Sequence, residues 1–379
     1  MIPFQRPRLP SVQATARYYA LAEERRYYTN FGPCHELLSA RLAERIGAPA
    51  QAVPVANCTL GLLLALRACT GGQAPQQREV VVPSYTFAAT GSAIAWAGLE
   101  PVFVDVDPGH WSMSPDALER VLAERGGSIA AVLACTTFGA PPPLAASQRW
   151  EQLASDAGVP LIVDSAAGFG ARDAAGREAG HLGDAEVFSM HATKPFAVGE
   201  GGFVATANPQ LAADVRRLSN FGFEDGHVTG GIGLNAKLAE WPAAAALAAL
   251  EEFDATLATR RRLAAGMRAA LEPAGFSFQD LDSEPTWQFV PALAPTAAAR
   301  AAVLRAGKAA GVQIRTYFDR PLHTLPPFRG AVRSGALPVT TELASRTLSF
   351  PMADDLTADE VAAITGTATA AVYQQTGAS

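Results

Sequence analysis

The sequence predicts an α/β protein whose larger domain is a three-layer αβα sandwich around a mostly parallel sheet. Short apolar runs rich in β-branched residues alternate with helical patterns through the middle of the chain. These runs are continuously apolar, which is typical of parallel strands covered by helices on both faces. The 379 residues are too many for one simple compact unit, so two domains are expected.

The expected strands follow each other closely along the chain. They cover residues 80–82, 101–106, 130–134, 161–164, 187–189 and 202–206. Helices are expected over residues 62–68, 114–124 and 150–157. Ser114 before Pro115 is a typical helix start, because serine caps free N–H groups and proline fits the first turn.

A long helical stretch from about Pro242 to Ala270 leads away from this region. We therefore expect a large domain at residues 1–249, which includes the N-terminal segment, and a smaller C-terminal α/β domain at residues 250–379. Mixed strand and helix patterns in the second domain cover residues 286–293, 297–310, 312–316 and 358–373.

Composition and charge exclude several classes of protein. Thirty basic and 36 acidic side chains give a net charge of −6, without the basic excess of a nucleic-acid-binding surface. The start of the chain, MIPFQRPRLPS, lacks the apolar core of a secretory signal, and no apolar run approaches the ~20 residues of a membrane-spanning helix. Four cysteines without a CxxC pair predict reduced thiols in the cytoplasm, and six scattered histidines predict no metal site.

Lys194 and Asp164 follow expected strands, where the functional residues of a parallel sheet collect. A lysine held among apolar groups has a lowered pKa and forms an imine with an aldehyde. A carboxylate beside a pyridine nitrogen keeps that nitrogen protonated. Taken singly, Lys194 is better explained as a surface lysine in a loop, and Asp164 alone is only a weak signal, since such a residue commonly caps the next turn.

Two further segments have the character of a phosphate site and an aromatic wall. Asn57-Cys58-Thr59-Leu60-Gly61 precedes a helix, whose free N–H groups would bind a phosphate together with the hydroxyls of Thr59 and Ser189. Phe87 follows another strand and could stack on a ring. The alternatives are a plain helix cap and ordinary core packing. The order of all these elements on successive strand ends indicates pyridoxal 5′-phosphate (PLP).

These residues resemble the DegT/StrS-type sugar aminotransferases, which belong to the fold-type I PLP enzymes of the aspartate aminotransferase superfamily. The likeness covers most of the chain. Its most specific parts are PSYTF followed by EPVFVDVDP, and HATKPF followed by GEGG; further likeness lies in VDSAAGFGA and GGIGLNAKLAEW.

The resemblance implies a role for each candidate residue. Lys194 would carry PLP as a Schiff base, Asp164 would pair with its pyridine nitrogen, and Phe87 would stack on its ring. The phosphate would be held by Thr59, Ser189, the amide of Cys58 or Leu60, and Asn235 from the neighbouring subunit. The resemblance therefore also implies a homodimer with shared active sites.

The resemblance further implies transfer of an amino group from an amino acid, by family likeness L-glutamate. The acceptor would be the keto group of a nucleotide-linked deoxysugar, with a 4-keto-6-deoxyhexose as the first expectation. Candidate substrate contacts are Asn30, Arg315, Tyr317 and His323, although domain packing or surface charge explains each equally well. The family usually has Gln or His at position 167, where this chain has Ala167.

Several alternatives stay open at this point. The acceptor could be a keto-cyclitol or a 3-keto sugar, and the protein could be a PLP-dependent sugar dehydratase or a non-catalytic regulatory subunit. Lys194 argues against the dehydratase branch in which histidine replaces the lysine. The intact set of Lys194, Asp164 and Ser189 argues against a non-catalytic subunit. No strand is followed by GxGxxG, which disfavours a nicotinamide dehydrogenase.

Overall fold

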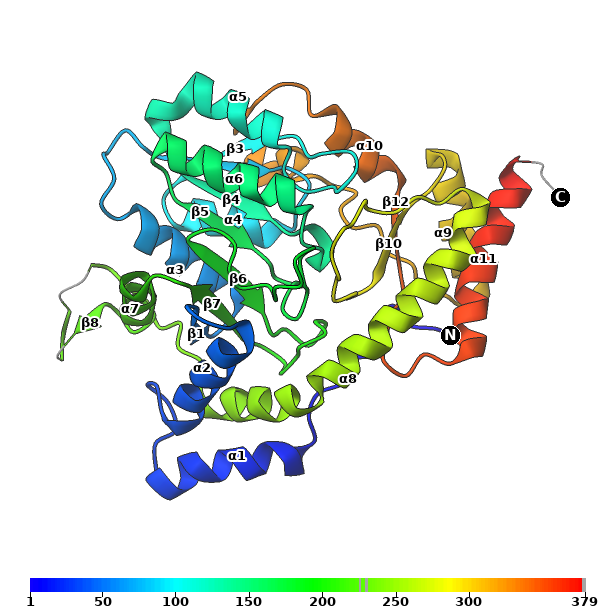
Figure 1. The fold of residues 1–379 in the computed structure, drawn as a ribbon. Helices are drawn as coiled ribbons and strands as arrows, with labels where there is room; N and C mark the ends of the chain where they lie inside the picture. The colour runs from blue at the N-terminus through cyan, green and yellow to red at the C-terminus, as the bar shows by residue number, and fades with distance from the viewer. Residues whose placement is uncertain (225, 229–230, 377–379) are drawn as a thin grey trace.

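An eight-stranded sheet forms the centre of the protein, counted over residues 1–224, 226–228 and 231–376, which the computed structural model describes (Figure 1). Its strands are β1 (Gln51–Val55), β2 (Glu79–Pro83), β3 (Glu100–Val104), β4 (Ile129–Cys135), β5 (Leu161–Asp164), β6 (Ala185–Ser189), β7 (Gly202–Thr206) and β11 (Val332–Arg333). Their order is β1-β7-β6-β5-β4-β2-β3-β11. All pairs are parallel except that β7 runs antiparallel to both β1 and β6. The expected mostly parallel sheet is confirmed.

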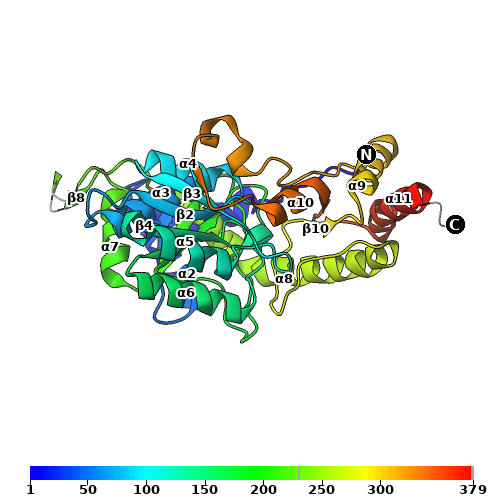
Figure 2. The same ribbon diagram turned by 90° about the horizontal axis from the view of Figure 1, so that it is seen from above.

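Helices cover both faces of this sheet, which confirms the three-layer arrangement (Figure 2). Side chains alternate between the layers: Ile162 packs with α3, α4 and α7, whereas Leu161 and Val163 pack with α5 and α6. Helix α2 packs on the same side as α6, beside β1 and β7. The bounds are α1 (Val12–Arg25), α2 (Pro33–Ile46), α3 (Cys58–Thr70), α4 (Ala88–Trp96), α5 (Pro115–Arg125), α6 (Leu144–Ala157) and α7 (Pro209–Leu218).

Local sequence signals explain where several helices start and stop. The Ser114 hydroxyl accepts from the N–H of Ala117, with Pro115 in the first turn of α5, as the sequence predicts. Helix α6 ends at Gly158, whose φ of 65° suits glycine. It begins six residues earlier than expected, at Leu144 directly after Pro143.

Strand β1 has no counterpart among the expected strands. Pro54 lies within it, and proline removes a donor from a strand. The strand is at the edge of the sheet, where this loss is tolerated, and the Pro54 carbonyl accepts from His35 Nε2 at 3.2 Å. Within the expected range 312–316, which belongs to the mixed pattern of the C-terminal part, Val312 and Arg315 make isolated bridges to Ile2 and Ser349.

The C-terminal part follows the long helix α8 (Glu240–Leu271), which runs from beside α1 to beside α11 (Figure 1). Residue 249 lies inside α8, so the proposed division of the chain there stays a prediction. Residues 225, 229–230 and 377–379 of the two expected domains lie outside the described residues. The remaining elements are β8 (Phe223–Glu224), β9 (His227–Val228), β10 (Val290–Leu293), β12 (Thr347–Phe350), α9 (Ala297–Ala310), α10 (Pro338–Arg346) and α11 (Ala358–Thr376).

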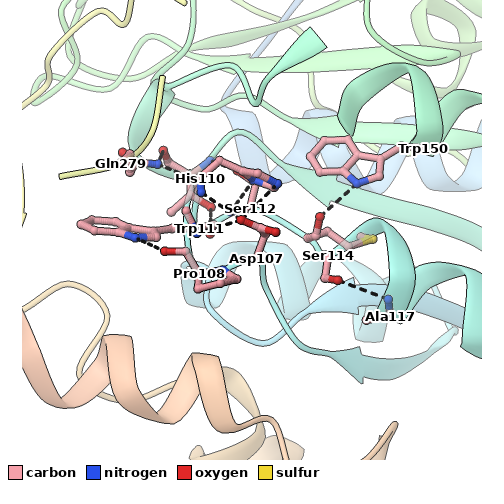
Figure 3. Close-up of polar contacts among 12 residues, drawn as sticks. Asp107, Pro108, His110, Trp111, Ser112, Ser114, Ala117, Trp150 and Gln279 are labelled. Atoms are coloured by element: carbon pink, nitrogen blue, oxygen red, sulfur yellow. Dashed lines mark hydrogen bonds and ion pairs between the residues drawn. The ribbon is translucent and has the colours of Figure 1, made fainter. Parts of the chain in front are cut away.

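The loop after β3 attaches the C-terminal part to the large sheet (Figure 3). Asp107 Oδ1 accepts from the N–H groups of Gly109 at 2.8 Å and His110 at 3.2 Å, which fixes the turn. The carbonyl of His110 then accepts from Gln279 Nε2 at 2.9 Å. Because Gln279 follows α8, this contact joins distant parts of the sequence next to the cavity described below.

Three further findings concern membrane-spanning helices, metal sites and the state of the cysteines. Over residues 1–224, 226–228 and 231–376, no helix has the length and apolar character needed to cross a membrane. Within the same ranges, no three His, Cys, Asp or Glu side chains gather as a metal site would require. Cys34, Cys58, Cys69 and Cys135 are free thiols.

Candidate active site

A cavity of about 1030 Å³ lies at the carboxyl ends of the parallel strands. Its wall includes every cofactor residue expected from the sequence except Asn235, namely Cys58, Thr59, Leu60, Phe87, Asp164, Ser189 and Lys194. These residues come from the ends of β2, β5 and β6 and from the start of α3. The topology of the sheet therefore gathers cofactor residues that are up to 136 positions apart in the sequence, from Cys58 to Lys194.

Lys194 lies in the loop between β6 and β7 with its amine facing the cavity. Lys194 Nζ donates to Gln288 Oε1 at 3.1 Å. Burial lowers the pKa of Lys194, and the nearby Cys58, Asp164 and Cys135 oppose that change. A lowered pKa increases the fraction of neutral amine, which is the form that attacks a carbonyl carbon.

Asp164 ends β5 and is 4% exposed. Its Oδ2 accepts from Thr90 Oγ1 at 2.7 Å, and its Oδ1 accepts from the N–H of Ala166 at 3.1 Å. Burial raises the pKa of Asp164, whereas these two donors and the charge of Lys194 lower it. The carboxylate is thus held in one orientation and suits a cationic partner inside the cavity.

The N-terminus of α3 forms an anion site at one end of the cavity. The first N–H groups of a helix have no partner within it, and the helix dipole favours an anion there. Asn57 Oδ1 caps the N–H of Leu60 at 2.9 Å, which leaves the amides of Cys58 and Thr59 for a phosphate. Ser189 Oγ accepts from the N–H of His191 at 3.2 Å, so its own proton stays available for donation.

Gly202 lets β7 pack closely against the N-terminus of α3. A Cβ atom at Gly202 would lie 2.7 Å from both the amide nitrogen of Cys58 and the carbonyl oxygen of Phe188. Only glycine lets the start of β7 approach the first turn of α3 so closely. The GEGG motif therefore has a packing role beside the proposed phosphate site.

Aromatic side chains form another wall of the cavity. Phe87 is 57% exposed and lies 6.4 Å, centroid to centroid, from Phe318. Phe138 and Phe318 stack at 5.2 Å with an interplanar angle of 16°. Since Phe87 is exposed to the cavity and not buried, core packing does not account for it, and stacking on a ligand ring stays its predicted role.

The substrate residues expected from the sequence lie in different places. Tyr317 lines the cavity, whereas Asn30, Arg315 and His323 are outside its wall in a single copy of the chain. Asn235 is also exposed and outside the wall, although Gly233 and Leu234 next to it line the cavity. Substrate contact stays a prediction for these residues.

Local contacts account for three of them. His323 Nδ1 pairs with Ser84 Oγ at 2.7 Å, and burial lowers the pKa of His323. The carbonyl of Asn30 accepts from the Tyr27 hydroxyl at 2.9 Å. The guanidinium of Arg315 lies 6.0 Å from the ring of Phe4.

The structure also identifies residues that the sequence pattern does not assign. Thr90 holds Asp164, and Gln288 holds Lys194. Thr90 sits three positions after Phe87 at the start of a helix, so the spacing offers a weak signal. For Gln288 the signal in the sequence is weaker still: it is a polar residue among the apolar residues of the segment TWQFV.

This set of residues fits PLP. Free helix amides and hydroxyls at Thr59 and Ser189 match a phosphate, an amine at Lys194 matches an aldehyde, and the buried carboxylate of Asp164 matches a pyridinium. The cavity is also much larger than a small planar ring needs, which leaves space for a substrate.

Comparisons with known proteins agree with this chemistry. A model of the DegT/DnrJ/EryC1/StrS aminotransferase family matches residues 13–368. A Mycobacterium tuberculosis relative, Protein MT3510, is 34% identical over 366 residues, 96% of this chain and 88% of that protein. A dTDP-4-amino-4,6-dideoxy-D-glucose transaminase of Shigella dysenteriae is 30% identical, over 67% and 66% of the two chains. A UDP-N-acetyl-3-dehydro-alpha-D-glucosamine 3-aminotransferase of Acidithiobacillus ferrooxidans is 31% identical, over 83% and 82%.

Solved structures have the same fold. A Bacillus cereus protein assigned as a PLP-dependent aminotransferase has a TM-score of 0.91 and 29% identity, over 97% of this chain and 99% of that one. DesI, solved in the presence of its TDP-sugar product, has a TM-score of 0.89 and 33% identity, over 99% and 93%. The expected cofactor is confirmed. This chain belongs to the DegT/DnrJ/EryC1/StrS aminotransferase family and is a PLP-dependent aminotransferase.

Proposed function

We propose that the protein transfers the amino group of L-glutamate to the keto group of a nucleotide-linked deoxysugar, with a 4-keto-6-deoxyhexose as the first candidate. The observation that carries this proposal is that Lys194 and the buried Asp164 both line one large cavity, in a chain related to transaminases of such sugars. The likeness to DesI, solved with a TDP-sugar, supports the same substrate class.

The proposed roles follow from the position of each residue. PLP, when bound, withdraws electrons from the carbon atom that carries the transferred amino group. The amine of Lys194 acts first as a general base, which removes a proton from the donor Cα. It then acts as a general acid, which donates a proton to the cofactor. Asp164 supplies the negative charge that favours a protonated ring nitrogen. Thr59, Ser189 and the amide of Cys58 hold the phosphate, and Phe87 covers the ring.

A 3-keto sugar is the second candidate acceptor, and the relative from Acidithiobacillus ferrooxidans favours it by name. A dehydratase on the same scaffold would release its product without consuming glutamate in proportion. The stoichiometry of glutamate therefore separates transfer from dehydration, whichever sugar is used.

The test is a screen of keto-sugar nucleotides and keto-cyclitols with glutamate, with products identified by mass. We expect glutamate-dependent formation of an amino sugar and an equal amount of 2-oxoglutarate with a 4-keto-6-deoxyhexose nucleotide. Turnover of a 3-keto sugar alone would move the proposal to the second candidate. Turnover of keto-cyclitols alone, or a product formed without loss of glutamate, would contradict it.

We also propose that two copies of the chain complete each other's site. Trp96 and Ile232 line the cavity and are 82% and 85% exposed in a single copy. Large exposed apolar side chains at a cavity mouth mark an interaction surface. The loop around Asn235 borders this mouth, and its exposed amide would reach the phosphate site of the partner across a two-fold axis.

Mixing two inactive variants tests this sharing. Lys194→Ala and Asn235→Ala proteins are each expected to be strongly impaired alone. In a mixed dimer, one site would combine the intact Lys194 of one chain with the intact Asn235 of the other. About a quarter of wild-type activity should return, since half of randomly mixed dimers carry one complete site. If mixing restores nothing although exchange is shown by mass, Asn235 does not act across subunits.

A further inference from the structure

We propose that Gln288 is a positioning residue that holds the free amine of Lys194 in the place from which it reacts. Gln288 Oε1 accepts a hydrogen bond from Lys194 Nζ at 3.1 Å. Among the described residues, Gln288 is the hydrogen-bond partner of this amine. Gln288 is 8% exposed and lines the cavity. The proposal rests on the attachment of PLP to Lys194 and does not depend on the identity of the sugar.

The backbone around Gln288 is fixed by neighbours on both sides. Trp287 has a φ of 58°, a left-handed conformation that a bulky residue adopts only when its surroundings impose it. Arg260 Nη1 donates to the carbonyls of Trp287 at 3.1 Å and Gln288 at 3.4 Å. Arg260 is itself buried and paired with Asp354 at 2.6 Å. These contacts orient the segment that presents the amide to Lys194.

The same segment is attached to the loop after β5. Thr286 Oγ1 donates to the carbonyl of Ala167 at 2.5 Å. Position 167 lacks the polar side chain that the family resemblance implies, and Ala167 and Gln288 both line the cavity. Gln288 therefore supplies an amide in a part of the wall where the loop itself offers only a methyl group.

A chain of hydrogen bonds fixes the orientation of the Gln288 amide. Its Nε2 donates to Thr193 Oγ1 at 3.3 Å, so the Thr193 hydroxyl is left to donate to His191 Nδ1 at 2.8 Å. The N–H of Thr193 also donates to His191 Nδ1, at 3.2 Å. His191 Nδ1 is thus an acceptor, and Nε2 carries the proton toward Glu200, at 3.7 Å. Because Gln288 Nε2 donates to Thr193, the amide of Gln288 must present its oxygen to Lys194.

An amide side chain does not exchange protons readily, so this chain of contacts orients the amine and does not relay its proton. The charged and titratable groups that face the amine are Asp164 from β5, Cys58 from α3 and Cys135 from β4. His191 and Glu200, on the same loop as Lys194, also line the cavity. Substitution of Gln288 by glutamate would add a negative charge directly beside the amine and favour its protonated form.

The test measures how fast Lys194 attaches to PLP in the full-length protein freed of cofactor, as a function of pH, with borohydride trapping and mass detection. Gln288→Ala should attach PLP about tenfold more slowly at all pH values, because the amine loses its oriented contact. Gln288→Glu keeps the shape and should shift the pH profile upward by about one unit. The matched control is Gln279→Ala, since Gln279 is also buried but binds the carbonyls of His110 and Thr137 and is not part of the cavity wall (Figure 3).

Two results would overturn the proposal. One is a Gln288→Glu profile that coincides with the wild type, which would show that residue 288 does not contact the reacting amine. The other is an equal slowing by Gln279→Ala, which would show a general loosening of the C-terminal part. If Gln288→Ala does not fold, the isosteric glutamate variant decides alone. A failed sugar screen would leave these measurements unaffected, because no sugar takes part in them.

Discussion

Lys194→Ala is expected to abolish covalent attachment of PLP and to lower kcat by at least about 10³-fold. The alanine lacks both the amine that bonds to the aldehyde and the group that moves the proton. No second lysine lines the cavity over the described residues, so no neighbour takes over either role. The measurement combines the visible absorbance of the purified protein with the rate of 2-oxoglutarate formation from glutamate.

Two companion variants make the interpretation specific. Lys194→Arg retains a positive charge but cannot form the imine, so it should be as inactive as the alanine variant. Lys308→Ala removes an exposed lysine near the end of α9 and should behave as the wild type. Normal turnover of Lys194→Ala would refute the role of its amine as the proton carrier.

Asp164→Asn is expected to lower kcat by about 10²–10³-fold while PLP remains attached to Lys194. Asparagine has nearly the same shape and still accepts from Thr90, but it has no charge with which to hold a protonated ring nitrogen. The effect should therefore fall on the proton-transfer step and leave the affinity for the phosphate group nearly unchanged. Stopped-flow absorbance with glutamate separates these two quantities.

The control for Asp164 is Asp156→Asn, which changes an exposed carboxylate on α6. Its rate should equal that of the wild type. If Asp164→Asn reacts as fast as the wild type while the cofactor spectrum is unchanged, the carboxylate is not the partner of the ring nitrogen.

The parts of the site that follow short local patterns are predictable from the sequence. Asp164 ends an apolar run, Lys194 lies in the loop after the next one, and the cap at Asn57 precedes a helix. Their position at one edge of the sheet therefore follows from the parallel topology. Strand direction is different. The antiparallel course of β7 depends on its pairing with β1 and β6, which no pattern within Gly202–Thr206 encodes.

The contacts that support the reacting groups are not predictable in this way. Gln288 is 94 residues from Lys194, and Thr90 is 74 residues from Asp164. Each pair meets only after several elements have packed. The sequence identifies the groups that react, whereas the groups that orient them are set by tertiary structure.

The wall of the cavity is built from segments that span residue 5 to residue 318, with Gln5 at one limit and Phe318 at the other. No contiguous fragment contains the whole binding surface, so an unfolded or partly folded chain has negligible affinity for the cofactor. By thermodynamic linkage, a ligand that binds only the native ensemble lowers its free energy and shifts the unfolding equilibrium toward it. The supply of vitamin B6 thereby becomes a determinant of how much of this protein persists in a cell.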